Sequence, residues 1–405
     1  MPAGGALAGI KVVDFGWAWA GAFATKQLAD NGATVVKVES PRRPDVMRCD
    51  RHVSISKPDN PDDKPLFAFL NTSKYSITVD LRNPKSRPLL ERLIKWADVV
   101  SENFTPGTLD KLGYGYDYAS RINPAIVYCS SSAYGQTGPM AREWGLDGTA
   151  CAYSGRLCLT GWPDIDPVMP SCCPYADAVT PLLAAAAIVA GLDYRRRTGK
   201  GQYIDISMVE VLAYQIAPAF LAWQLNTTLV TRSGNRTPDA APHGVFPCLG
   251  EDRWCAIAVF TEEEWQAFCR VVDEPWARDP KFETLSLRKL NEDELERLIS
   301  NWTRHRTAEE VMNALQEAGV PAGVVQTGED LISDPQLSLR QFLVPVEHPA
   351  LGAIECPAPA YKLSKTRAQV RPAPCMGQHN EYVCTQLLGF SDEQFARMIQ
   401  EGVFD

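Results

Sequence analysis

The N-terminal part of the chain alternates between strand and helix patterns, and this constrains the fold more than any other feature. Residues 9–15 form a β-branched run typical of a buried strand, and residues 21–31 follow with a helical pattern that stops at Gly32. Residues 33–39 form a second strand of the same kind. Strand, helix and strand within about thirty residues make a βαβ unit. The sequence therefore predicts an α/β fold in which helices cover a parallel sheet.

The first turn of this unit argues against a dinucleotide site. NAD binding in a βαβ unit needs Gly-x-Gly-x-x-Gly, because glycine lets the backbone approach the pyrophosphate closely. This chain has Gly16-Trp-Ala-Trp-Ala-Gly21 instead, so two tryptophans stand in place of the glycines. Glu39 stands where an acid for the ribose is expected, but without the glycines the pattern does not favour NAD.

Strand patterns recur further along the chain. They occur at residues 75–80, at Val99-Val100 and again at 126–132, with helical segments between them. Glu102-Asn103-Phe104 would then lie at the carboxyl end of its strand, which is the edge where open α/β sheets bind ligands. Residues 42–65 are rich in proline, aspartate and basic residues, and they predict an irregular surface loop.

The pattern changes after a single apolar helix predicted over residues 210–225. A polar connection, a short hairpin and several amphipathic helices follow, which is typical of a smaller α+β domain. The sequence thus predicts a large Rossmann-like domain over residues 1–225, a small α+β domain over 226–343 and a C-terminal segment over 344–405.

Composition excludes several classes of function. The net charge of −9 argues against general nucleic-acid binding. No apolar run is long enough to predict a membrane span, and the N-terminus lacks the pattern of a signal peptide, so we expect a cytoplasmic protein. The 12 cysteines have no paired spacing and predict free thiols. The five histidines lie near no Cys-x-x-Cys, so no metal site is predicted.

Several separated strings together resemble one enzyme family, the family III (CaiB/BaiF) coenzyme A transferases. This family includes formyl-CoA transferase, carnitine CoA-transferase and the α-methylacyl-CoA racemases. The resemblance runs nearly from end to end, and no single short motif carries it. The strings are Gly9-Ile-Lys-Val-Val-Asp14, residues 28–39, 97–107, Tyr134-Gly-Gln-Thr-Gly-Pro139, residues 197–208, Gly319-Val-Pro-Ala-Gly323 and Gly377-Gln-His379.

The resemblance implies an architecture and a set of partners. Two chains would interlock like links, and each large Rossmann-like domain would be completed by its own C-terminal segment. The assembly would be a homodimer or a hetero-oligomer with a related subunit, and a non-catalytic subunit is the alternative to an active enzyme. The substrates would be an acyl-CoA and a carboxylic acid. Coenzyme A would enter as a thioester substrate, with no tightly bound cofactor.

Asp177 is the candidate catalytic residue. It lies where a loop meets the small-residue helix that follows, and on position alone an aspartate there is most often a helix cap. By matching position it resembles the aspartate that attacks the acyl thioester and forms a mixed anhydride. We expect a carboxylate at a helix N-terminus to stay ionised and therefore ready to react at neutral pH.

The resemblance also carries coenzyme A contacts onto this chain. Lys74 and Lys111 are the expected phosphate partners, although an ordinary solvated lysine is the alternative for each. The chain departs from the family pattern at Ser40, often a basic residue, and at Ala22, usually a proline. The full set of predicted coenzyme A contacts is Trp19, Ala20, Leu70, Asn71, Lys74, Asn103, Phe104, Thr105 and Lys111.

The racemase branch shares the fold and the aspartate, but its chemistry needs a second acid–base group across the substrate. In that branch the group is a histidine in a Gly-His-Asp string, and the matching string here is Gly145-Leu146-Asp147. Leucine cannot move a proton, and no histidine lies between His52 and His243. The sequence therefore favours acyl transfer over racemisation.

Tryptophans predict an aromatic wall around the acyl group. Trp17 and Trp19 lie in the first turn, and Trp144 and Trp162 lie closer to Asp177, although packing is the alternative for the last two. The first-turn pair is similar to that of transferases for aromatic or branched acids, such as those of benzylsuccinate degradation, with succinyl-CoA as donor. The predicted substrate pocket comprises Trp17, Trp144, Leu146, Tyr134 and Gly135, the last two in a glycine loop that could also be an ordinary turn.

Overall fold

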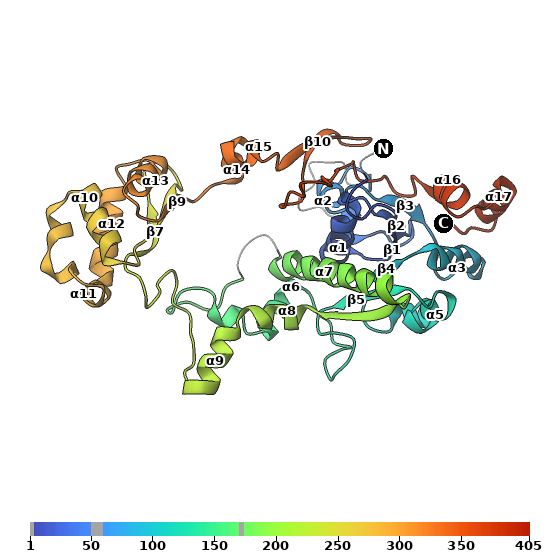
Figure 1. Ribbon diagram of the computed structural model, residues 1–405, viewed down its shortest axis with the longest axis horizontal. Helices are drawn as coiled ribbons and strands as arrows, with labels where there is room; N and C mark the ends of the chain where they lie inside the picture. The colour runs from blue at the N-terminus through green and yellow to red at the C-terminus, as the bar shows by residue number, and fades with distance from the viewer. Residues whose placement is uncertain (1–3, 50–59, 170–173) are drawn as a thin grey trace. The chain divides into compact units, whose positions relative to one another are not determined.

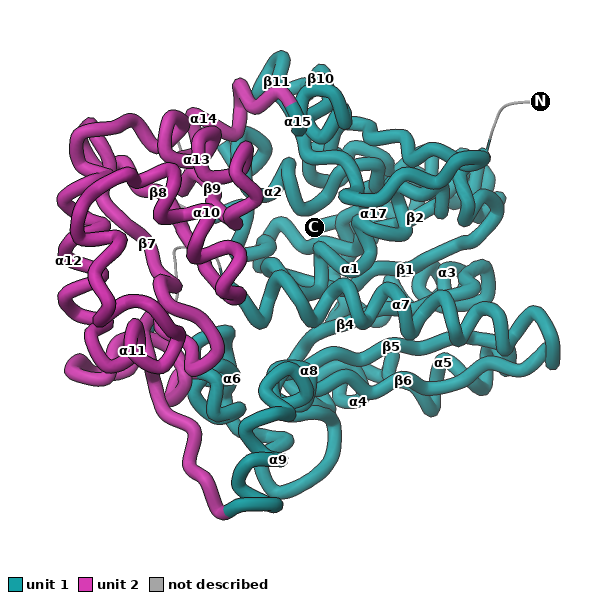
Figure 2. The backbone as a smooth tube through the Cα atoms, turned by 60° about the vertical axis from the view of Figure 1, so that its left-hand side comes forward, with its two compact units in different colours: residues 1–156, 169–226, 336–405 teal, residues 157–168, 227–335 magenta. Residues whose placement is uncertain are grey.

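The computed structural model describes residues 4–49, 60–169 and 174–405. Figure 1 labels its helices and strands along the chain. The chain divides into two compact units, which Figure 2 shows in different colours. Unit 1 comprises residues 1–156, 169–226 and 336–405, and unit 2 comprises residues 157–168 and 227–335. Because the chain leaves unit 1 and returns to it, both ends of the chain belong to unit 1.

A six-stranded sheet forms the centre of unit 1, and all its strands are parallel. The strand order is β3-β2-β1-β4-β5-β6, the doubly wound arrangement in which the chain changes direction across the sheet between β1 and β4. This confirms the predicted α/β class. The strands are β1 Lys11–Asp14, β2 Thr34–Glu39, β3 Tyr75–Thr78, β4 Val99–Glu102, β5 Val127–Ser132 and β6 Gln202–Ser207.

Helices lie on both faces of this sheet. The unit 1 helices are α1 Ala18–Asp30, α2 Pro65–Leu70, α3 Arg87–Trp96, α4 Thr108–Leu112, α5 Tyr116–Ile122, α6 Asp147–Tyr153, α7 Tyr175–Thr198, α8 Met208–Gln215, α9 Ala217–Asn226, α16 Asn380–Tyr382 and α17 Asp392–Gln400; α15 Pro335–Leu339 crosses the boundary with unit 2.

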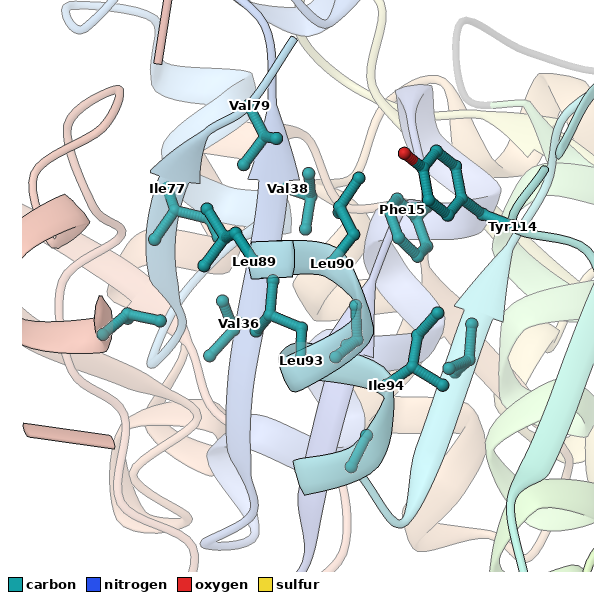
Figure 3. Close-up of a cluster of buried hydrophobic side chains, with 14 of the residues drawn as sticks. Phe15, Val36, Val38, Ile77, Val79, Leu89, Leu90, Leu93, Ile94 and Tyr114 are labelled. Atoms are coloured by element: carbon teal, nitrogen blue, oxygen red, sulfur yellow. The ribbon is translucent and has the colours of Figure 1, made fainter. Parts of the chain in front are cut away.

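The strands have apolar side chains on both faces because both faces are covered. Val12, Val35 and Val99 pack on one face against small and aliphatic side chains of α1 and α7. On the other face, α3 lies across the strands, and its leucines meet Val36 and Ile77. Figure 3 shows this second cluster, with the α3 side chains pointing into the sheet. Burial on both sides explains why these strands are continuous β-branched runs.

The C-terminal segment covers the β3 edge of the sheet. The backbone N–H of Ser76 donates to His379 Nδ1 at 3.2 Å, and that of Thr78 donates to Asn380 Oδ1 at 2.9 Å. The N–H of Asp80 donates to the carbonyl of Val403 at 2.9 Å. The segment also contains an antiparallel hairpin, β10 Leu343–His348 and β11 Gly352–Pro357. The edge of the sheet is therefore paired within unit 1.

Helix α7 packs closely on α1 and the sheet because its side chains are small. Ala184, Ala185 and Ile188 are buried there, and a Cβ on Gly191 would lie 2.9 Å from Val127 Cγ1. Among the described residues, α7 has the length and apolar content of a membrane span, and the bent pair α8 and α9 passes the same test only if taken together. Core packing explains only part of the apolar character of α7, because Leu182, Leu183 and Val189 are exposed.

Two local predictions are wrong. The apolar segment expected as one helix is two helices, α8 and α9, bent by 63° after Gln215. The segment expected as a surface loop contains Arg48, which is fully buried and makes a two-bond ion pair with Glu39, at 2.7 and 2.9 Å. A buried arginine needs such a partner, so part of this loop belongs to the interior of unit 1.

Unit 2 has its own core around a three-stranded antiparallel sheet. The strands are β7 His243–Pro247, β8 Trp254–Ala258 and β9 Ala322–Val324, and the first two form the predicted hairpin. Thr261 and Thr307 cap α10 and α13 with capping boxes, which fixes where these helices begin. The helices are α10 Glu262–Val272, α11 Leu285–Leu290, α12 Glu292–Thr303, α13 Ala308–Glu317 and α14 Gly328–Ser333.

Candidate active site

Asp177 is the third residue of α7, and it is not the helix cap. The capping position is occupied by Pro174, whose side chain makes no capping hydrogen bond. The N–H groups of the first turn would therefore lack a partner unless another element supplied one. The interpretation of Asp177 as a cap does not hold in this structure.

Asp147, the first residue of α6, supplies that partner. Its Oδ1 accepts hydrogen bonds from the backbone N–H groups of Ala176 at 2.5 Å and Asp177 at 3.2 Å. Asp147 is free for this because Thr149 caps α6 in its place, with its hydroxyl bonded to the N–H and carbonyl of Leu146 at 2.8 Å each. The N-terminus of α7 is thus fixed by a carboxylate from a neighbouring helix.

The carboxyl group of Asp177 is partly buried. Within the described ranges 4–49, 60–169 and 174–405, no hydrogen bond or ion pair to this carboxyl group is found. Burial, and after it the negative charge of Asp147, raise the pKa of Asp177 to about 7. Burial therefore opposes the effect of the helix dipole, which by itself favours the ionised form of Asp177.

The first turn after β1 is joined to the loop after β4. Asn103 Oδ1 accepts from the N–H of Trp17 at 2.8 Å, and Asn103 Nδ2 donates to the carbonyl of Trp17 at 3.0 Å. A Cβ on Gly21 would lie 2.4 Å from Asn103 Oδ1, so this close approach requires glycine. The bond pair spans the boundary between β1 and β4, where doubly wound sheets bind their ligands.

Two buried lysines, Lys74 and Lys37, bond to the backbone of the same turn. Lys74 donates to Asp14 at 2.9 Å and to the carbonyl of Ala22 at 2.8 Å, and Lys37 donates to the carbonyl of Gly16 at 2.6 Å. A second ion pair joins Lys37 to Asp45, whose other oxygen accepts from the N–H of Ala18. Burial lowers the pKa of Lys74 to about 8, although Asp14 opposes this shift. These pairs fix the backbone course of the turn.

A cavity of about 660 Å³ opens beside this turn. Its lining comes from the segments that follow β1, β2, β3 and β4, so it lies at the carboxyl edge of the sheet. Four basic residues and one acid contribute to it, which suits a ligand with several negative charges. The lining residues are Trp17, Ser40, Arg42, Arg43, Val79, Asp80, Leu81, Arg82, Phe104, Thr105, Thr108, Lys111 and Leu112.

The predicted coenzyme A contacts separate into two groups. Phe104, Thr105 and Lys111 line the cavity. The second group lies in the interior: Leu70 is fully buried, and the ammonium group of Lys74 has three bonds to Asp14, Ala22 and Asn71. In this structure Lys74 braces the first turn and does not face the cavity.

The other predicted residues flank these features. Ala20 is buried in the first turn of α1, and the indole Nε1 of Trp19 is buried without a hydrogen-bond partner among the described residues. Asn103 bonds to the first turn as described above. None of these positions excludes a contact with coenzyme A, and their role stays a prediction.

The predicted substrate residues are placed around α6 and the first turn. Trp17 lines the cavity and makes an edge contact with Phe104. Tyr134 makes an edge contact with Tyr153 of α6, and Leu146 occupies the N-cap position of that helix without a side-chain capping bond. The side chains of Trp144 and Leu146 are 92% and 77% exposed, so neither forms an enclosed wall. Gly135 is buried beside Asp205.

Sequence reasoning missed three features of this site. Asp147 was noted only as part of the Gly-Leu-Asp string, and its bonds to α7 depend on a contact between helices. Arg42 and Arg43 were counted as loop residues, although they follow the end of β2 and so face the binding edge. Arg82 follows β3 in the same way. Basic residues directly after a strand are the signal that could have found the last three.

Metal chemistry has no evident location in the described part of the chain. No group of three or more histidine, cysteine, aspartate or glutamate side chains there is arranged to hold a metal ion. The acids nearest to Asp177 and to the first turn are already engaged with backbone N–H groups or lysines.

Comparison with known proteins decides the family. The sequence model described as CoA-transferase family III matches residues 7–380, which is most of the chain. The chain belongs to CoA-transferase family III. This confirms the resemblance found in the sequence, and it makes the protein a CoA-transferase that uses coenzyme A thioesters as substrates.

Relatives named as CoA-transferases match almost the whole length of this family III chain. It is 33% identical to a succinyl-CoA–D-citramalate CoA-transferase of Chloroflexus aurantiacus, with 96% of each chain covered. It is 30% identical to the human succinyl-CoA:glutarate CoA-transferase, with 98% of this chain and 90% of the relative covered. A crystal structure of a CaiB/BaiF family protein from Brucella suis has a TM-score of 0.86 at 30% identity, covering 95% of this chain and all of that one.

Proposed function

We propose that this family III CoA-transferase moves coenzyme A from an acyl-CoA donor to a second carboxylic acid, with Asp177 as covalent nucleophile. The observation that carries the proposal is the carboxyl group of Asp177, which has no hydrogen-bond or ion-pair partner among the described residues. It lies on a helix in which the N–H groups of Ala176 and Asp177 are taken by Asp147. A carboxyl group with a pKa of about 7 is ionised in a large fraction of molecules at neutral pH. It is also more basic than an ordinary aspartate.

The proposed reaction conserves the thioester bond in four steps. The Asp177 carboxylate attacks the thioester carbon, the C–S bond breaks, and coenzyme A leaves as a thiolate. The thiolate then attacks the aspartyl carbonyl of the mixed anhydride and releases the donor acid as a carboxylate. The incoming carboxylate attacks the aspartyl thioester, and the thiolate leaves again. It finally attacks the acyl carbonyl of the new anhydride, which forms the product and frees Asp177.

The cavity of unit 1 is our proposed site for the nucleotide end of coenzyme A. Arg42, Arg43, Arg82 and Lys111 bring four positive charges to a cavity with one lining acid, Asp80. Phosphate groups need such partners, and two arginines after β2 compensate for Ser40. The pantetheine would pass the first-turn backbone, which the buried ion pairs hold in place.

For the donor we propose succinyl-CoA, and for the acceptor a branched or substituted dicarboxylic acid. The names of two relatives support the donor, and their acceptors, D-citramalate and glutarate, are both dicarboxylic acids. Trp17 and Trp19 predicted an aromatic or a branched acid. The branched type is supported by D-citramalate, the branched acid in the name of one relative. Benzylsuccinate remains the aromatic candidate, and it shares the two carboxyl groups.

We further propose that the protein works as an oligomer in the cytoplasm. Helix α9 has no buried residue, and its Leu221, Trp223 and Leu225 are more than half exposed, which is typical of a surface that another chain covers. The ten described cysteines are free, which fits a reducing compartment. Native mass spectrometry of the chain expressed alone distinguishes a homodimer from a subunit that needs a different partner.

An exchange panel tests the proposed function. The protein is incubated with succinyl-CoA and, in separate reactions, with citramalate, glutarate, benzylsuccinate, oxalate or carnitine, and the new CoA thioesters are measured by mass spectrometry. We expect product with a branched or substituted dicarboxylate and none with carnitine. A preference for oxalate or carnitine contradicts the proposed substrates, and loss of every exchange in a folded protein contradicts the proposed activity.

A further inference from the structure

The carboxylate of Asp147 faces the nucleophile from another helix. Its Oδ1 bonds to two successive N–H groups of the first turn of α7, and its Oδ2 lies 3.9 Å from the thiol of Cys151. The side chain is buried, with 8% of the residue exposed. Asp147 therefore contacts the backbone of Asp177 but leaves its carboxyl group free.

The two hydrogen bonds have a consequence for the direction of the Asp177 side chain. An aspartate in the first turn of a helix can bend back and accept hydrogen bonds from the free N–H groups of that turn. Here those of Ala176 and Asp177 are taken, so the Asp177 carboxyl group has less reason to bend back. A cap supplied by α6 thus keeps the nucleophile available to a substrate.

The charge of Asp147 has a second consequence. Among the described residues, the ionisable groups at this point are Asp147 and Cys151 on α6, Arg156 after α6, and Asp177 itself. The guanidinium of Arg156 stacks on the ring of Tyr175. Tyr175 bonds to the neutral Gln215 of α8 at 2.9 Å. Burial and then the charge of Asp147 raise the pKa of Asp177. When Asp177 is acylated it loses its own charge, and the repulsion between the two carboxylates ends.

We propose that Asp147 is a positioning residue for the nucleophile, which holds the first turn of α7 and sets, through its charge, the pH range in which Asp177 reacts. This inference rests on the proposed role of Asp177. In the acylation step the carboxylate forms the new C–O bond, the C–S bond breaks, and the electron pair leaves on the thiolate. Asp147 exchanges no proton or electron pair in this step. Its negative charge favours the acylated state, because acylated Asp177 no longer carries a negative charge beside it.

Three substitutions separate the two roles of Asp147. Asp147→Asn keeps the accepting oxygen and removes the charge, Asp147→Ala removes both, and Asp147→Glu keeps the charge. Asp193→Asn is the matched control, because Asp193 is exposed on the same helix about 24 Å from Asp177. At that distance its charge is screened.

The readout is the rate at which Asp177 is acylated by succinyl-CoA in a single turnover, measured as a function of pH by hydroxylamine trapping and peptide mapping. We expect Asp147→Asn to move the midpoint to lower pH by a few tenths of a unit to about one unit, since burial remains. Its melting temperature should stay close to that of the wild type. Asp147→Ala should show the same shift and, in addition, a lower plateau rate and a lower melting temperature.

Each outcome supports or overturns the inference. If the pH midpoint of acylation is unchanged in Asp147→Asn, the proposed effect of the Asp147 charge is overturned. If that variant does not fold, a midpoint in Asp147→Glu that differs from the wild type overturns the same effect, because this variant keeps the charge. An Asp147→Ala protein with the plateau rate and melting temperature of Asp147→Asn overturns the positioning role. If a residue other than Asp177 is labelled in the wild type, the proposed function is overturned. If Asp177 is labelled but the Asp147 variants keep the wild-type pH midpoint, plateau rate and melting temperature, this inference alone is overturned.

Discussion

Replacing Asp177 by asparagine should stabilise the protein at alkaline pH while removing its activity. Burial raises the pKa of Asp177 from its ordinary value of 3.8 to about 7. A carboxyl group with a raised pKa in the folded state is bound to a proton more tightly there than in the unfolded state. Ionisation of Asp177 therefore destabilises the folded state. This destabilisation is absent below pH 3.8, grows as the pH rises, and is complete above pH 7.

The size of this effect follows from the same values. Each pKa unit corresponds to about 1.4 kcal/mol, so the full difference at pH 8 is roughly 4 kcal/mol. Asp177 is only partly buried, and solvent screening reduces this to about 2 kcal/mol. With an unfolding entropy of about 2.1 cal/mol/K per residue, the melting temperature of a chain of this length rises by about 2 °C. Asparagine has nearly the same shape and carries no charge, so it isolates the effect of ionisation.

Differential scanning fluorimetry of Asp177→Asn and the wild type, from about pH 5 to about pH 8, measures this difference. The gain should shrink as the pH falls, because the wild-type carboxyl group then becomes neutral as well. Asp193→Asn, on the exposed face of α7, should show no such gain. A lower melting temperature for Asp177→Asn at pH 8, or a gain that is the same at both ends of the range, would refute the reasoning.

Three further predictions follow from the same structure. Lys111→Ala should raise KM for succinyl-CoA roughly tenfold with little change in kcat, because a charged phosphate partner is lost; equal KM values for Lys111→Ala and the exposed control Lys95→Ala would contradict this. Lys74→Met should lower the free energy of unfolding by about 3–5 kcal/mol, because Asp14 stays buried without its ion-pair partner. Urea denaturation measures this loss, and the double variant Lys74→Met with Asp14→Asn should recover part of it. In D₂O, no deuterium should enter the α-carbon of a 2-methylacyl-CoA, because Leu146 cannot move a proton; exchange there would indicate racemase chemistry.

The sequence predicted the sheet of unit 1 because its strands are covered on both faces. Val12 and Val13 point to opposite faces and are both buried, so the strand reads as a continuous β-branched run. Helix boundaries with capping boxes, such as that at Thr261, are also local signals. The break after Gln215 was not predictable, because the residues on both sides of it are apolar and helical in pattern.

The chemical environment of the site was less predictable than the identity of its nucleophile. Asp177 was found by matching position, but its pKa depends on burial and on Asp147, which lies on another helix. Lys74 was predicted to face phosphate, yet the turn above it encloses its ammonium group between Asp14 and Ala22. Contacts between segments distant in sequence decide both cases. They leave no periodic pattern in the chain.

The identity of the acylated residue tests the central claim most directly. The protein is incubated with succinyl-CoA, the adduct is trapped with hydroxylamine or borohydride, and the tryptic peptides are mapped by mass spectrometry. We predict modification at Asp177 within the peptide of residues 157–195, and no modification there in Asp177→Asn. Modification at another residue, or full transferase activity in Asp177→Ala, would contradict the proposed mechanism.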